Sequence, residues 1–79
     1  MRVPKYEEFE KAVYKSYLRQ TKGLDPEEVK EYFKSDEAIH EIQAAYKRNC
    51  KKLEDGVISE AIFLGDGAAS VAMCLSMMV

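Results

Sequence analysis

The stretch AIFLGDGAAS, residues 61–70, is the part of the sequence most similar to a ligand-binding loop. An apolar run followed by Gly-x-Gly often begins a phosphate site, in which a strand ends and a helix N-terminus receives the anion. That chemistry requires neighbouring strands in a parallel sheet. The preceding sequence indicates helices, and no Gly-Lys-Ser/Thr follows the glycines. We therefore predict neither a nucleotide nor any other cofactor.

The two glycines of this stretch are better explained as residues of a helix. Small residues recur there at helical spacing and would let a neighbouring backbone approach closely: Gly65, Ala68, Ala69 and Ala72. Each glycine costs a helix about 1 kcal/mol relative to alanine, so either tight packing or a kink is expected. The alternative is a break, with Asp66 capping a new segment that starts at Gly67.

The sequence DGVIS, residues 55–59, is similar to the centre of an EF-hand calcium loop. If Gly56 occupied the sixth position of such a loop, the positions that supply oxygen ligands would hold Lys51, Leu53 and Ile62. None of these side chains is a calcium ligand. We therefore interpret the segment as a glycine-containing turn between two helices.

Catalytic chemistry has few candidate residues. His40 is the only histidine, and with Asp36 one helical turn before it, the pair is only half of a metal or acid–base site. Cys74 stands among Met73, Leu75 and Met77, which predicts a buried thiol without a neighbouring base. We predict no metal site and no catalytic residue, and therefore a protein that is not an enzyme.

Four basic residues gather near the end of the third predicted helix: Lys47, Arg48, Lys51 and Lys52. Such a cluster could contact the phosphates of a nucleic acid. Against this, the start of the same helix carries Asp36, Glu37 and Glu41, which would repel phosphate. Cations in the last turns of a helix also complement its dipole. Nucleic-acid binding is therefore the less favoured alternative.

Composition indicates one small globular domain. The chain has 79 residues, of which 47% are hydrophobic and 33% are charged, and its net charge is −2. A domain of this size buries only roughly 60% of the surface of its unfolded chain, so its core is thin. Cys50 and Cys74 have no metal-binding spacing, and the N-terminal sequence MRVPKYEEFEK lacks the apolar core of a signal peptide. We expect a cytoplasmic protein with reduced thiols; its size and composition are typical of small helical bacterial proteins.

Three amphipathic helices are predicted before the turn at 54–56. The first spans about 4–22, with Pro4 in its first turn and Gly23 after its end. One apolar stripe runs along it through Tyr6, Phe9, Val13 and Tyr17, and it leaves Tyr14 exposed. The second helix spans about 26–34 and the third about 36–53.

The signals for the starts of the second and third helices are strong. Asp25 is the expected N-cap of the second helix, with Pro26 at its first position and Glu28 completing a capping box. Ser35 is the expected N-cap of the third helix, with Asp36 in its first turn.

The fourth predicted helix spans about 59–78, with Ser59 as its N-cap. It is apolar nearly all round, so we expect it to be surrounded by the other helices. Only thirteen residues follow Asp66, its last charged residue, and a membrane span needs about 20, so we predict no membrane association. Together these segments predict an all-α fold: a small four-helix bundle with an apolar C-terminal helix packed against three amphipathic ones.

The apolar C-terminal residues suggest a function. They face more than one direction, and three short helices cannot cover all of them: Met73, Met77, Met78 and Val79. Methionine is suited to adaptable contact surfaces. We therefore expect a noncatalytic protein that acts through self-association, as a homo-oligomer, or through binding of a protein partner.

Overall fold

In the computed structural model, which describes residues 2–78, the chain is helical and contains no strand. The helices are α1 (Tyr6–Gln20), α2 (Pro26–Phe33), α3 (Asp36–Glu54) and a C-terminal helix made of three consecutive parts, α4 (Glu60–Ile62), η1 (Phe63–Gly67) and α5 (Ala68–Met77). The predicted all-α fold is confirmed, and no predicted helix end differs from the observed one by more than two residues.

The predicted N-caps are confirmed. The Asp25 carboxylate accepts a hydrogen bond from the Glu27 backbone N–H at 3.0 Å, and the Ser35 hydroxyl accepts one from the Ala38 N–H at 3.3 Å. The Ser59 hydroxyl accepts one from the backbone N–H of Ile62 at 3.2 Å. These bonds satisfy backbone donors that have no partner inside their helix. The capping box is wrong in one respect, because the Glu28 side chain makes no bond back to the Asp25 backbone.

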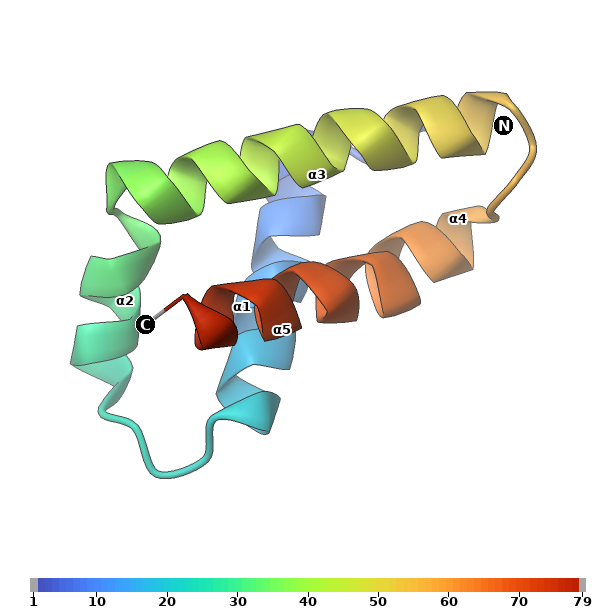
Figure 1. The fold of residues 1–79 in the computed structure, drawn as a ribbon. Coiled ribbons are helices and arrows are strands. Elements are labelled where there is room, and N and C mark those ends of the chain that lie inside the picture. The colour runs from blue at the N-terminus through green and yellow to red at the C-terminus, as the bar shows by residue number, and fades with distance from the viewer. Residues whose placement is uncertain (1, 79) are drawn as a thin grey trace.

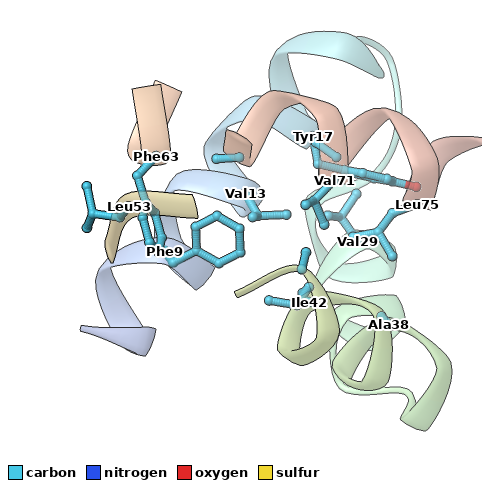
Figure 2. Close-up of a cluster of buried hydrophobic side chains, with 13 residues drawn as sticks. Phe9, Val13, Tyr17, Val29, Ala38, Ile42, Leu53, Phe63, Val71 and Leu75 are labelled. Atoms are coloured by element: carbon cyan, nitrogen blue, oxygen red, sulfur yellow. The ribbon is translucent and has the colours of Figure 1, made fainter. Parts of the chain in front are cut away.

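Helix α1 packs across the other helices. Figure 1 shows α1 behind both α3 and the C-terminal helix, with α2 joining α1 to α3 at one end. Its most extensive contact is with α5. The predicted stripe of α1 accordingly lies in the core, where Phe9, Val13 and Tyr17 are buried against residues such as Phe63 and Leu75 (Figure 2).

The C-terminal helix is continuous, but one of its turns is wider than an α-helical turn. Residues Phe63–Gly67 form a π-helical turn, which holds one more residue than an α-helical turn. Phe63 and Ala68 are therefore both fully buried although they are five residues apart, and Ala72 and Leu75 continue the same buried face. The glycines lie within a helix, as predicted, and the alternative of a break with Asp66 as a cap is wrong, because the helix passes through this residue without interruption.

Only one face of the C-terminal helix is covered, so the prediction that it would be surrounded is wrong. Met73 and Met77 are 57% and 79% exposed. Gly65 is also exposed, with no atom within 4 Å of the position that a Cβ would occupy, so it does not serve close packing as predicted. The covered face lies mainly against α1.

Tyr14 is more buried than predicted. Its ring is half-buried and makes an edge-to-face contact with Phe33 of α2, with the ring centroids 5.4 Å apart. The stripe on α1 is therefore wider than the spacing of its most buried residues indicates, because α2 covers one side of α1.

Length and composition alone would allow the C-terminal helix to cross a membrane. Its 18 residues from Glu60 to Met77 have a mean hydropathy of 1.3, and 28% of them are buried. This overturns the argument that the segment is too short. One such helix is weak evidence for a membrane span, and the buried face of this one packs on α1.

Candidate interaction surface

The uncovered side of α5 is a row of apolar side chains, which we call the methionine face: Met73, Cys74, Met77 and Met78. All four residues are exposed. Residues 73, 74 and 77 lie on one side of a helix, because residues three and four positions apart are neighbours on its surface. Three of the four predicted interface residues therefore lie on one exposed surface, and the fourth, Val79, lies outside the described residues.

A groove borders this face between α3 and the C-terminal helix. Its volume is about 260 Å³. One wall is formed by α3 and the other by the C-terminal helix, and Ile58 of the connecting turn lies at one end. The lining residues are Ala45, Arg48, Asn49, Lys52, Ile58, Ile62, Asp66, Gly67, Ser70, Val71 and Cys74. Cys74 belongs to both surfaces, so the groove and the methionine face are continuous.

Asn49 of α3 and Gly67 of the C-terminal helix lie close together in the groove. A Cβ atom at Gly67 would lie 2.9 Å from Asn49 Nδ2 and 3.3 Å from the carbonyl oxygen of Ile62. Asn49 is 9% exposed and lines the groove, and its carboxamide makes no hydrogen bond with any other described residue. The donors and the acceptor of this amide are therefore available to a ligand that enters the groove.

The structure divides the basic cluster into two pairs. All four side chains are exposed, but only Arg48 and Lys52 line the groove. Lys47 and Lys51 lie elsewhere on α3, and Lys51 is 4.0 Å from the carboxylate of Asp55. Residues 48 and 52 are one helical turn apart, so their side chains are neighbours on the same wall. Asp66 lines the groove from the C-terminal helix.

The other candidate residues are not assembled into a site. His40 is exposed on α3, and among residues 2–78 no group of three or more His, Cys, Asp or Glu side chains could hold a metal ion. Both cysteines are free thiols; Cys50 is half-buried and Cys74 is exposed. The predicted burial of Cys74 is wrong, because the additional residue in the π-helical turn places Leu75 in the core instead.

Two tyrosine hydroxyls form hydrogen bonds between segments that are far apart in the chain. Tyr32 of α2 donates a hydrogen bond to the carbonyl of Leu75 at 2.9 Å, and Tyr46 of α3 donates one to the carbonyl of Pro4 at 2.6 Å. Burial raises the pKa of both hydroxyls above the ordinary value for tyrosine. The end of α5 is thereby tied to α2, on the covered side of the helix.

Sequence reasoning identified the methionines and the basic cluster but missed the groove. Asn49 and Ile62 gave no signal, because they lie on different helices and each is ordinary in its own segment. Comparisons with protein-family models, with curated proteins and with solved structures found no match.

Proposed function

We propose that this protein is a noncatalytic interaction module that associates with a second copy of itself or with another protein through the methionine face. The observation that carries the proposal is the one-sided burial of the C-terminal helix. Ala68, Ala72 and Leu75 are fully buried, whereas Met77 on the opposite side is 79% exposed. Exposed apolar area of this kind, beside polar residues, is typical of protein contact sites.

The chemistry of the face supports contact with a protein. Methionine side chains are flexible and polarizable, so they adapt to differently shaped apolar partners. The two free thiols, Cys50 and Cys74, support our placement of the protein in a reducing compartment such as the cytoplasm. His40 and Cys74 are exposed, and among residues 2–78 neither belongs to a group of three or more His, Cys, Asp and Glu side chains that could hold a metal ion.

Light scattering during size-exclusion chromatography, over a wide range of loading concentration, tests self-association. We expect a mass that rises with concentration toward that of a dimer or larger assembly. Met77→Glu should return the protein to a monomer, because it places a charge in the contact. Val57→Glu is the matched control, since Val57 is 68% exposed but lies in the turn before the C-terminal helix.

A monomer at every concentration would contradict self-association. Binding to another protein would then be tested with the same pair of variants, and a partner whose affinity is unchanged by Met77→Glu would contradict the methionine face as the contact site.

A second candidate function is nucleic-acid binding by the basic cluster. The observation in its favour is the exposure of all four side chains on consecutive turns of α3. A gel shift that weakens as salt increases, and that disappears in the variant with Lys51→Glu and Lys52→Glu, would support it. No shift at low salt with DNA or RNA would rule it out.

A further inference from the structure

We infer that the groove between α3 and the C-terminal helix binds an acidic amphipathic segment of a protein partner, with a carboxylate of the segment held by Arg48, Lys52 and Asn49. This inference rests on the proposed function and specifies the partner. It is carried by the charge, the unpaired amide and the apolar lining of the groove.

The α3 wall carries the positive charge. Arg48 and Lys52 are one turn apart, line the groove and form no ion pair with another described residue. A guanidinium and an ammonium at this spacing can both reach one carboxylate, and such charge-assisted hydrogen bonds are stronger than neutral ones. These two side chains therefore favour an acidic residue in the partner.

Asn49 of α3 provides hydrogen-bond donors inside the groove. Asn49 is 9% exposed as a residue, and it lines the groove together with the two cations. Its NH₂ group has two donors, and neither is used by another described residue. Gly67 leaves the room that this amide occupies, because any larger residue there would press on Nδ2. A carboxylate between Arg48 and Lys52 would satisfy the amide as well.

The remaining lining favours a protein segment over a nucleic acid. Ile58, Ile62, Val71 and Cys74 offer apolar contacts to the apolar side chains of a partner helix. Asp66, on the wall opposite the cations, would repel the continuous phosphates of a nucleic acid. It also confines the carboxylate of a peptide to the α3 side. An amphipathic helix with acidic residues on one edge matches both walls.

The test is selection from a displayed library of helical peptides with apolar residues at every third or fourth position and all other positions free. We expect the peptides selected on the natural protein to be rich in Asp and Glu beside their apolar residues. A selected peptide should bind at least about fivefold more weakly to the variant with Arg48→Gln and Lys52→Gln.

The matched control is the variant with Lys47→Gln and Lys51→Gln, which loses the same charge from the same turns but outside the groove. Its affinity for the selected peptide should stay within about twofold, because exposed charges outside the contact contribute little. Asn49→Leu, which keeps the branched shape of the side chain but removes its polar atoms, should also weaken binding. In NMR spectra of the natural protein, the peptide should shift the Asn49 side-chain amide signals.

Each contrary outcome overturns the inference. These outcomes are selection of basic or uncharged peptides, no selection at all, equal weakening by the two double variants, and binding of an oligonucleotide that requires Arg48 and Lys52 while no acidic peptide is selected. These outcomes do not decide whether the methionine face mediates association, which is tested by Met77→Glu and light scattering. A stable dimer without acidic-peptide binding would remove only the inference about the groove.

Discussion

The side chain of Asn49 on α3 lies directly against Gly67 in the π-helical turn, where a Cβ would be 2.9 Å from Asn49 Nδ2. The second glycine of the same turn, Gly65, has no neighbour within 4 Å of its Cβ position. Two glycines that are separated by one residue in sequence therefore differ: packing opposes a side chain at Gly67 but not at Gly65. The contact at Gly67 lies in the groove, between its α3 wall and its C-terminal helix wall.

Alanine substitutions should separate these two roles. Gly65→Ala should raise the free energy of unfolding by about 0.5–1 kcal/mol, because alanine favours helix and nothing obstructs its methyl group. Gly67→Ala should gain nothing or destabilise, since its methyl group meets Asn49 and lies 3.3 Å from the Ile62 carbonyl oxygen. Urea unfolding followed by circular dichroism measures both. Equal stabilisation by the two substitutions would show that the contact is loose.

The two thiols should react at different rates. Cys74 is exposed on the methionine face and Cys50 is half-buried, so a thiol reagent should modify Cys74 at least about tenfold faster. Mass spectrometry of the Cys50→Ser and Cys74→Ser variants identifies which residue reacts. Equal rates, or faster reaction of Cys50, would mean that the C-terminal helix is rotated from the orientation described here. If the protein dimerises, Cys74 should become protected as concentration increases, while Cys50 should not change.

Stability should fall in alkaline solution. Burial raises the pKa of Tyr6, Tyr17, Tyr32 and Tyr46, so each hydroxyl holds its proton more tightly in the folded state than in the unfolded state. The unfolded chain then loses these protons first, and stability decreases as pH rises above about 10, through the folded-state pKa values. Urea unfolding at a series of pH values measures the decrease.

Phenylalanine variants show how much of that decrease comes from the tyrosines. Tyr32→Phe removes the hydrogen bond to Leu75 and should cost about 1 kcal/mol at neutral pH. The same variant should show a smaller loss of stability between neutral and alkaline solution than the natural protein. An unchanged alkaline loss in both Tyr32→Phe and Tyr46→Phe would assign it to other groups.

The protein should remain in solution in the presence of lipid vesicles. Insertion of the C-terminal helix would remove Phe63, Ala68 and Leu75 from their contacts and expose the apolar stripe of α1 to water. Glu60 and Asp66 would also have to enter or approach the hydrocarbon region. Flotation with phosphatidylcholine vesicles checks this expectation. Recovery of the protein with the vesicles, prevented by Met77→Glu, would show membrane binding by the methionine face.

Most of the secondary structure was predictable because its signals are local. Asp25 and Ser35 cap the backbone within three residues of themselves, so their effect does not depend on the rest of the fold. The exposed methionines were also predictable, since three short helices offer too little surface to cover an apolar helix completely. The sequence by itself thus determined four helices, their ends, and the presence of exposed apolar side chains near the C-terminal end.

The tertiary structure decided which side of the C-terminal helix is exposed. Packing of Phe63 and Ala68 together against α1 requires the π-helical turn, and this turn brings Leu75 into the core and leaves Cys74 outside. Regular α-helical periodicity contains no sign of the extra residue. The same packing placed Asn49, Arg48 and Lys52 opposite Asp66 and formed the groove. Such relations depend on contacts between residues far apart in the chain, which no local pattern specifies.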